Sequence, residues 1–231
     1  MQKLFGGANR GKPLTARTIV LDLDNTLICT QDEMDDYKNL KIGTDPKLTS
    51  LRSRVYRLSA SDVVSKRGSG ENFLFWGTMR PGCRKFLDFC FRYFRYVVVW
   101  SAGKKRYVEA LVDYLFKDTF KPDLILTHDD CVRAYDGDSA ILEKPLTKVM
   151  KLLGAKEVKE SNILVLDDNP TTFSGPNPDN ALYIPMYEPK PEIEELEDES
   201  DQALAQAERW LLLPEVIKSP DVRQLDKSEI F

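Results

Sequence analysis

Short apolar runs alternate with stretches of helical periodicity along most of the chain. The apolar runs are rich in β-branched residues and have the length of buried strands. They cover residues 18–23, 96–100, 124–127, 163–166 and 181–184. Strands that alternate with helices are typical of an α/β fold with a mainly parallel sheet. The pattern therefore predicts a central, mainly parallel sheet that is flanked by helices.

Three helices are predicted between these strands. One begins at Pro81, which suits the first position of a helix, and its apolar residues recur at intervals of three and four. A second follows Gly103, and a third covers residues 145–153, with Gly154 as its C-terminal cap. A fourth, near the C-terminus, presents an apolar face over residues 204–211. It follows an acidic run that we interpret as a solvated linker or a helix start.

Two segments break the alternation. Strand-like runs at residues 55–58 and 72–76 flank a turn-rich, basic stretch, which predicts a flap-like β-hairpin over about residues 50–79. A smaller hairpin is predicted over about residues 128–143, directly before the third helix. The basic stretch around Lys66 either contacts further negative charge on a substrate or is simply solvated, as exposed hairpins commonly are.

The length of the chain favours one domain with decorations. It has 231 residues, of which 42% are apolar, and this suffices for one sizeable core. We predict a disordered N-terminus over residues 1–13, a single folded domain over residues 14–215 and a C-terminal tail over residues 216–231. The two inserted hairpins are too short to form a large cap domain.

Composition narrows the function. The net charge of −4 and the isoelectric point near 5.3 disfavour direct nucleic-acid binding, for which a basic stripe is expected. No apolar run is long enough to span a membrane, and the first residues lack the apolar core of a signal peptide. We therefore expect a soluble, intracellular protein of the cytoplasm or nucleus that has no membrane partner.

Cysteine and histidine usage excludes several kinds of site. The cysteines form no C-x-x-C pair, which favours reduced thiols over a disulfide framework or a zinc site. They are Cys29, Cys83, Cys90 and Cys131. His128 is the single histidine, so phosphatases that use paired histidines or several histidine metal ligands are disfavoured.

Acidic side chains stand at the ends of two predicted strands. Asp22 and Asp24 end the first apolar run, and Asp167 and Asp168 follow the fourth. Ligands of open parallel sheets bind at the carboxyl ends of the strands. Carboxylates beside a buried strand are costly unless a cation or hydrogen bonds compensate them. Either pair alone also fits an ordinary polar loop, but together they suggest a divalent cation with oxygen ligands, which describes Mg²⁺.

Two further residues suit a phosphate group. Ser101 follows a strand and precedes a helix, where a hydroxyl and backbone N–H groups bind phosphate oxygens readily. It could equally be the N-cap of that helix. Lys144 stands immediately before Pro145. Alone it would be an ordinary surface lysine, but beside the carboxylates it supplies the positive charge that a phosphoryl site needs.

The motifs, in this order, resemble those of the haloacid dehalogenase superfamily. They are Asp-Leu-Asp-Asn-Thr from Asp22, Trp-Ser-Ala-Gly from Trp100, Glu-Lys-Pro from Glu143 and Leu-Asp-Asp-Asn-Pro from Leu166. The run from Met79 to Gly82 is similar to the Arg-Pro-Gly of phosphatases that act on the C-terminal domain of RNA polymerase II. The resemblance covers about residues 15–215. It implies a Rossmann-like haloacid dehalogenase fold without a large cap domain, as in the small, catalytic-domain-only members.

The resemblance also implies a role for each residue. Asp22 is the expected nucleophile, and Asp24 is the expected general acid and base. Mg²⁺ is expected to contact Asp22, the backbone carbonyl of Asp24 and Asp168, with Asp167 nearby or linked through water. The side chains expected to hold the phosphate oxygens are Thr26, Ser101 and Lys144.

The implied activity is Mg²⁺-dependent hydrolysis of phosphoserine or phosphothreonine in a protein or peptide, through an aspartyl-phosphate. The C-terminal repeats of RNA polymerase II are one candidate substrate. Two departures bear on it: small members usually carry Asp-Asn at Asp167 and Asp168, and the docking domain of larger members has no counterpart here. The alternatives are a phosphatase of small molecules or nucleic-acid ends, a phosphotransferase, and an inactive phosphopeptide-binding module.

Overall fold

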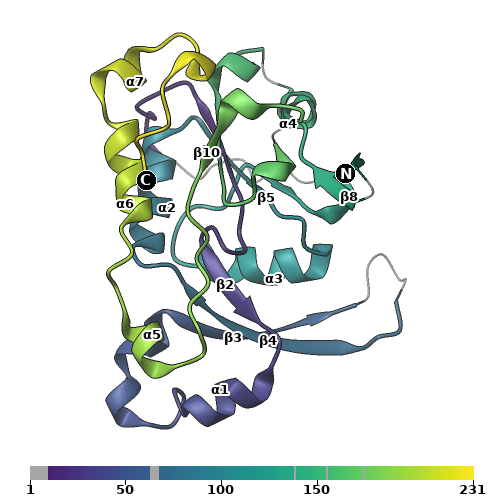
Figure 1. Cartoon of the computed structure of the whole chain (residues 1–231), viewed down its shortest axis with the longest axis vertical. Coiled ribbons are helices and arrows are strands. Elements are labelled where there is room, and N and C mark those ends of the chain that lie inside the picture. The colour runs from purple at the N-terminus through teal and green to yellow at the C-terminus, as the bar shows by residue number, and fades with distance from the viewer. Residues whose placement is uncertain (1–9, 63–67, 138, 155, 174) are drawn as a thin grey trace.

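Five parallel strands form the central sheet of the computed structural model (Figure 1). The structure describes residues 10–62, 68–137, 139–154, 156–173 and 175–231. The strands are β1 (Thr18–Leu21), β5 (Tyr96–Trp100), β6 (Leu124–Leu126), β9 (Ile163–Asp167) and β10 (Ala181–Tyr183). Their order is β10-β9-β1-β5-β6, and every pairing is parallel. The predicted α/β fold is thus confirmed, with β1 at the centre of the sheet.

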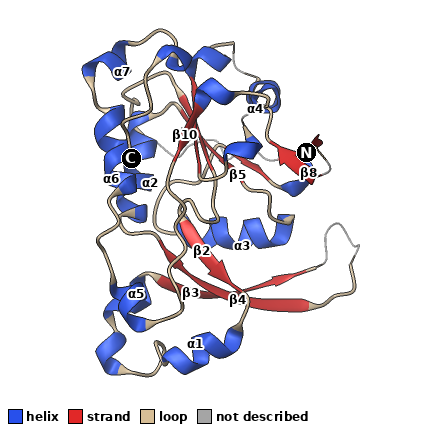
Figure 2. Cartoon of the chain, viewed as in Figure 1, coloured by secondary structure: helices blue, strands red, loops and turns tan. Residues whose placement is uncertain are grey.

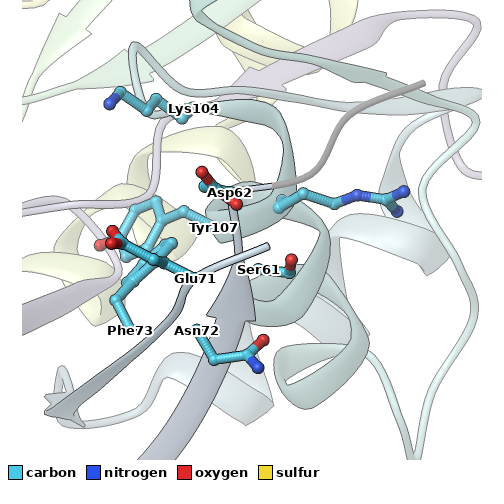
Figure 3. A pocket seen from close by; sticks show the side chains of 8 residues that line it. Ser61, Asp62, Glu71, Asn72, Phe73, Lys104 and Tyr107 are labelled. Atoms are coloured by element: carbon cyan, nitrogen blue, oxygen red, sulfur yellow. The ribbon is translucent and has the colours of Figure 1, made fainter. Parts of the chain in front are cut away.

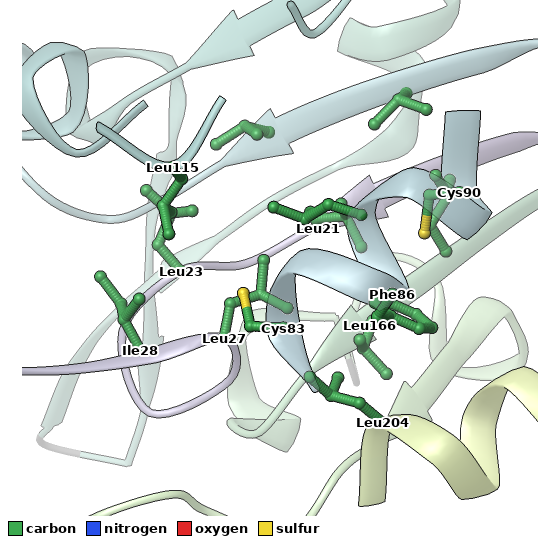
Figure 4. Close-up of a cluster of buried hydrophobic side chains, with 14 of the residues drawn as sticks. Leu21, Leu23, Leu27, Ile28, Cys83, Phe86, Cys90, Leu115, Leu166 and Leu204 are labelled. Carbon is green, nitrogen blue, oxygen red and sulfur yellow. The ribbon is translucent and has the colours of Figure 1, made fainter. Parts of the chain in front are cut away.

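Helices cover both faces of this sheet. They are α2 (Cys83–Tyr93), α3 (Lys105–Leu115), α4 (Leu146–Leu153), α6 (Ala203–Leu211) and α7 (Pro214–Lys218). Ile19 and Leu21 belong to one core cluster with residues of α2, α3 and α6 (Figure 4), whereas Val20 belongs to a second cluster with residues of α4. All three side chains are fully buried. Burial on both faces is why β1 is an uninterrupted apolar run.

The predicted helices are present, with small shifts at their ends. α2 begins at Cys83 and not at Pro81, because Gly82 adopts a left-handed φ of 76° and serves as the N-cap. α4 ends at Leu153, and Gly154 is its C-cap as predicted, with a left-handed φ of 64°. β1 ends at Leu21, two residues before the end predicted for the first strand.

A second, antiparallel sheet lies beside α3 (Figure 2). Its strands are β2 (Ile28–Gln31), β3 (Val55–Ser61) and β4 (Asn72–Met79), in the order β2-β4-β3, and α1 (Met34–Leu40) lies between β2 and β3 in the chain. β3 and β4 form the predicted flap hairpin. β2 was not predicted; it follows the first motif and pairs with β4. Trp76 anchors a small core beneath this sheet together with Leu51 and with Leu196 of α5 (Ile193–Glu197). The basic pair Lys66 and Arg67 lies outside the described residues.

The smaller predicted hairpin is present as β7 (Val132–Asp136) and β8 (Ser139–Glu143). Gly137, in the turn between the two strands, takes a left-handed φ of 58°. Lys144 follows β8 directly, so the hairpin delivers this residue to the start of α4. Both insertions are short, which agrees with the prediction of a fold without a large cap domain.

Both ends of the described chain pack against the domain. Arg10 forms an ion pair with Asp123; residues 1–9 lie outside the described residues, so disorder there stays a prediction. Val222 and Ile230 are buried in the core cluster, although the sequence pattern assigned residues 216–231 to a tail. We therefore propose that the packed unit runs on through these residues.

In the described ranges, no helix is long and apolar enough to cross a bilayer.

Candidate active site

Three neighbouring strands bring candidate residues to one edge of the central sheet. Asp22 follows β1, Ser101 follows β5, and Asp167 is the last residue of β9. β1 lies between the other two strands and is parallel to both. Their carboxyl ends therefore meet, and this is the edge at which ligands of such sheets bind.

The chain makes a tight turn directly after β1. The backbone N–H groups of Leu27 and Ile28 both donate to the carbonyl of Leu23, at 2.8 and 3.1 Å. Asn25 takes a left-handed φ of 59°, which asparagine adopts more readily than most residues with a side chain. The turn sends the chain into β2 and keeps Asp24 within electrostatic range of the site.

Arg80 fixes this turn. Its guanidinium donates to the carbonyl oxygen of Thr26 at 3.1 Å and to both carboxylate oxygens of Asp201, at 3.0 and 3.1 Å. The side chain is only 1% exposed. The sequence singled out Arg80 through a resemblance alone, and the structure shows that it ties the turn to the segment before α6.

Lys144 is the cation of the site. Its ammonium lies 2.6 Å from a carboxylate oxygen of Asp22 and 2.7 Å from one of Asp167, and all three side chains are largely buried. Burial acts to lower the pKa of Lys144, but the two carboxylates outweigh burial and raise that pKa above its usual value. Lys144 is therefore a permanent positive charge between two carboxylates.

Asp167 and Asp168 are held in different ways. Asp167 accepts hydrogen bonds from Lys144, from the Thr172 hydroxyl at 3.1 Å and from the Asn169 N–H at 2.8 Å. Asp168 accepts a bond from the hydroxyl of Thr26 at 2.9 Å, and its own N–H donates to that hydroxyl at 3.0 Å. The Thr26 side chain is thus engaged with Asp168, and not directed at a phosphate as the sequence predicts.

The acidic residues of the site fit a divalent metal ion. One carboxylate oxygen each of Asp22, Asp167 and Asp168 lies within 4.8 Å of the others. Burial raises the pKa of the Asp22 carboxyl, the neighbouring Lys144 lowers it, and the carboxylates of Asp167 and Asp24 raise it again. Two carboxylates contact the ammonium of Lys144 and two more, those of Asp24 and Asp168, interact with it electrostatically. A second cation would reduce the repulsion among these four acidic groups. All of these candidate ligand atoms are oxygens, which Mg²⁺ prefers as ligands.

Asp24 is held by hydroxyl groups. Its carboxylate accepts a hydrogen bond from the phenol of Tyr107, whose oxygen lies 2.7 Å from the hydroxyl oxygen of Thr30. Burial raises the pKa of the Asp24 carboxyl, and the hydrogen bonds from Tyr107 and Thr30 lower it by less. A carboxyl with a raised pKa keeps its proton more readily, which suits an acid catalyst.

Ser101 lies at the predicted place but does not cap a helix. Its side chain is 2% exposed, and its hydroxyl oxygen accepts a bond from the N–H of Gly103 at 3.0 Å. α3 begins only at Lys105. A Cβ at Gly103 would lie 2.7 Å from the Tyr107 ring, so glycine is needed here for Tyr107 to pack against the loop.

A pocket of about 530 Å³ lies next to Tyr107. Figure 3 shows the side chains that line it, which come from the outer part of the flap and from the start of α3. The flap contributes Asp62, Glu71 and Phe73, and the other wall contributes Lys104 and Tyr107. The lining therefore combines both signs of charge with an aromatic surface. Tyr107, which lines this pocket, is also the residue that donates a hydrogen bond to Asp24.

Sequence reasoning missed the hydroxyl groups around Asp24. The spacing of Tyr107 from Leu111 predicts only that Tyr107 lies on the apolar face of the helix after Gly103. One signal was available: the hydroxyl of a buried tyrosine needs a hydrogen-bond partner. Which partner it finds depends on a contact between residues 83 positions apart in the chain.

A comparison with protein-family models identifies the family. The model of the NLI interacting factor-like phosphatases matches residues 17–223. The chain belongs to this family. The match spans every candidate residue from Asp22 to Asp168. It therefore places the sheet edge described above within a domain of a phosphatase family.

Relatives and solved structures agree with this family. The chain is 29% identical over 158 residues to the CTD phosphatase-like protein 355R of Invertebrate iridescent virus 6, which covers 66% of this chain and 76% of the viral protein. It also resembles two structures of the RNA polymerase II CTD phosphatase Fcp1. One, the fission yeast R271A variant bound to beryllium fluoride, has a TM-score of 0.57 at 19% identity and covers 76% of this chain. The other has a TM-score of 0.58 at 18% identity and covers 94%.

The similarity to Fcp1 bears on the fold. This chain covers 43% and 59% of the two Fcp1 chains, so it spans about half of their length. The fold of this family member is that of the haloacid dehalogenase phosphatases, as the motifs predict.

Proposed function

We propose that this family member is a Mg²⁺-dependent phosphatase that removes phosphate from serine or threonine side chains of proteins, through an aspartyl-phosphate at Asp22. One observation carries the proposal: Asp22 lies 2.6 Å from the buried ammonium of Lys144, and its carboxylate is grouped with two others within 4.8 Å. A carboxylate nucleophile, a fixed cation and a metal-binding set of oxygens are the parts that such a reaction needs. Membership of a phosphatase family supports the same activity.

Asp22 and Asp24 have different roles in the proposed reaction. A carboxylate oxygen of Asp22 attacks phosphorus as the bond from phosphorus to the serine oxygen breaks, and Asp24 gives its proton to that leaving oxygen. Asp24 then takes a proton from the water that attacks the aspartyl-phosphate. Inorganic phosphate leaves and the Asp22 carboxylate is restored. The raised pKa of Asp24, which burial causes, supports its first role as an acid.

The acidic residues would hold the metal ion. Asp22, Asp168 and the backbone carbonyl of Asp24 are its proposed ligands, with Asp167 nearby or linked through water. Bound there, Mg²⁺ supplies positive charge that offsets the repulsion between a carboxylate nucleophile and an anionic phosphate. Thr26 orients Asp168 through the 2.9 Å hydrogen bond.

Lys144 and Ser101 are the proposed partners of the phosphate oxygens, where negative charge spreads in the transition state. Lys144 is already held between Asp22 and Asp167, so no reorganisation is needed when charge develops. Ser101 uses its oxygen to accept the Gly103 N–H and keeps its own proton as a donor. We assign Thr26 to the orientation of Asp168, and no longer to the phosphate.

A phosphorylated protein segment is the proposed substrate. The insertions are short hairpins, which leave the sheet edge accessible to a polypeptide. The pocket beside Tyr107 is lined by groups of both charges and by Phe73, and Tyr107 itself contacts Asp24, so the pocket suits residues that flank the phosphoserine. The Fcp1 structures are of an RNA polymerase II CTD phosphatase, and we propose the repeats of that domain as the first substrate to test. Such substrates belong to the compartments expected from the sequence, the cytoplasm or nucleus.

A substrate panel tests this function. A phosphoserine peptide with the polymerase repeat, a nucleoside monophosphate and a sugar phosphate are each incubated with Mg²⁺ or with EDTA, and released phosphate is measured. We expect turnover of the peptide far above that of the two small molecules. EDTA should lower it by about 100-fold or more, because the charge that activates Asp22 toward an anionic phosphate is lost, and added Mg²⁺ should restore it.

The other outcomes separate the alternatives. Turnover of the nucleotide or the sugar phosphate without turnover of the peptide would reject the protein substrate. Full activity in EDTA would reject the role of the metal ion. Binding of the phosphopeptide without release of phosphate from any substrate would favour the inactive binding module.

A further inference from the structure

A chain of three hydroxyl groups ends at Asp24. The phenol of Tyr107 donates to the carboxylate of Asp24, the oxygens of Tyr107 and Thr30 are 2.7 Å apart, and those of Thr30 and Tyr56 are 2.6 Å apart. Tyr107 belongs to α3, Thr30 to β2 and Tyr56 to β3. Hydroxyl groups from three separate elements thus form one connected chain. The mechanism described above assigns none of these hydroxyls a role.

We propose that Tyr107, backed by Thr30 and Tyr56, is a positioning residue that aims the carboxyl group of Asp24 at the leaving oxygen. The inference rests on the proposed function, since it takes Asp24 to be the acid. Tyr107 does not touch the reacting phosphate in this proposal; it acts through Asp24.

Asp24 accepts hydrogen bonds from more than one hydroxyl. Tyr107 donates to its Oδ1, and a hydrogen bond from the Thr30 hydroxyl also acts on this carboxyl group. The Thr30 oxygen lies 2.6 Å from the hydroxyl oxygen of Tyr56, which has the carbonyl of Cys29, at 3.5 Å, as a second acceptor. Hydroxyls from α3 and from the antiparallel sheet thus fix the direction in which Asp24 presents its carboxyl group.

Packing holds the hydroxyls in place. The ring of Tyr107 lies against Phe75, with 4.9 Å between the centroids, and that of Tyr56 lies against Tyr114 at 5.1 Å. Tyr56 is 2% exposed. Gly77 leaves the space for it, because a Cβ at this position would lie only 2.4 Å from the Tyr56 hydroxyl oxygen. A group that is locked by its surroundings positions a catalytic side chain without further loss of entropy.

The dependence of kcat/KM on the leaving group of the substrate provides a specific readout of the orientation of Asp24. A good leaving group departs without protonation, whereas a poor one needs the acid. The quantity kcat/KM reports the step that releases the leaving group. If Asp24 is misoriented, kcat/KM therefore falls mainly for substrates with poor leaving groups. A general defect of the fold lowers kcat/KM for all substrates by the same factor. The two cases are distinguished by comparing 2,4-dinitrophenyl phosphate with phenyl phosphate, whose phenol has a pKa of about 10.

The experiment measures kcat/KM of both substrates, with Mg²⁺, for Tyr107→Phe, Thr30→Val, Asp24→Asn and the control Tyr96→Phe. Tyr96 is the first residue of β5, at the end of the strand away from Ser101, and its hydroxyl contacts Glu157 at 3.3 Å, so its variant loses the same atom outside the hydroxyl chain. For phenyl phosphate we expect Asp24→Asn to lose about 10²- to 10⁴-fold and Tyr107→Phe roughly 10- to 100-fold. For 2,4-dinitrophenyl phosphate Tyr107→Phe should stay within about threefold of wild type, which also shows that it folds. Thr30→Ser should recover what Thr30→Val loses, and Tyr96→Phe should behave as wild type.

Two results would overturn the inference, and they differ in what else they reject. If Asp24→Asn discriminates between the two substrates but Tyr107→Phe lowers both equally or neither, the positioning role is wrong and the proposed function stands. If Asp24→Asn itself lowers both substrates equally, Asp24 is not the acid. The proposed mechanism then fails, and the role of Tyr107 fails with it.

Discussion

The Asp22→Asn variant is expected to lose essentially all turnover, by about 10⁴-fold or more on both a phosphopeptide and an aryl phosphate, as when a covalent nucleophile is removed from an enzyme. An amide oxygen is a poor nucleophile, and the substitution also removes one proposed metal ligand. The fold should survive, because Lys144 keeps Asp167 as its partner at 2.7 Å. Released phosphate and far-ultraviolet circular dichroism measure the two quantities.

Asp113→Asn is the matched control. Asp113 lies in α3 with its carboxylate exposed, and it pairs with Lys121 at the surface. This variant loses the same charge away from the site and should keep the activity of wild type. If Asp22→Asn kept more than about one tenth of wild-type turnover, a nucleophilic role for Asp22 would be excluded.

The Lys144→Met variant is expected to lower the free energy of unfolding by about 3–5 kcal/mol in metal-free buffer, because it leaves two buried carboxylates without their counter-charge. The ammonium is 2.6 Å from Asp22 and 2.7 Å from Asp167, with 2% of its side chain exposed. Methionine keeps an unbranched side chain of nearly the same length and removes the ammonium group with its charge and its hydrogen bonds to Asp22 and Asp167. Urea unfolding followed by tryptophan fluorescence measures the change.

Lys148→Met is the control for this loss. Lys148 forms a 2.9 Å ion pair with Asp130, but a third of its side chain is exposed. Surface pairs of this kind contribute roughly 0–1 kcal/mol. If the two variants were destabilised equally, Lys144 would not be the charge that holds the site together. Adding Mg²⁺ to Lys144→Met should recover part of the loss, since a bound cation compensates the same carboxylates.

The sheet could be predicted because its signal is local. Each central strand is a short apolar run that both faces of the sheet bury, as the fully buried Ile19, Val20 and Leu21 illustrate. Alternation with helices then implies parallel strands, and parallel strands bring Asp22 and Asp167 to one edge. The candidate carboxylates therefore followed from the order of elements, before any contact between them was known.

The features that could not be predicted depend on distant contacts. β2 is a strand because it pairs with β4, and its four residues show no alternation that would predict this. The partner of Thr26 is Asp168, which lies 142 positions away in the chain. A hydroxyl can serve a ligand or a neighbouring side chain equally well. The sequence therefore identified Thr26 as part of the site, but not the group that it contacts.

The most direct test of the account is to trap the covalent intermediate. The protein is mixed with excess phosphopeptide and Mg²⁺, quenched in acid and reduced with borohydride, which converts an aspartyl-phosphate to homoserine; the modified position is then found by mass spectrometry. The account predicts homoserine at position 22, and none when Mg²⁺ is omitted or when Asp22→Asn is used. Turnover of the phosphopeptide without modification of Asp22, or with the modification at Asp24, would contradict it.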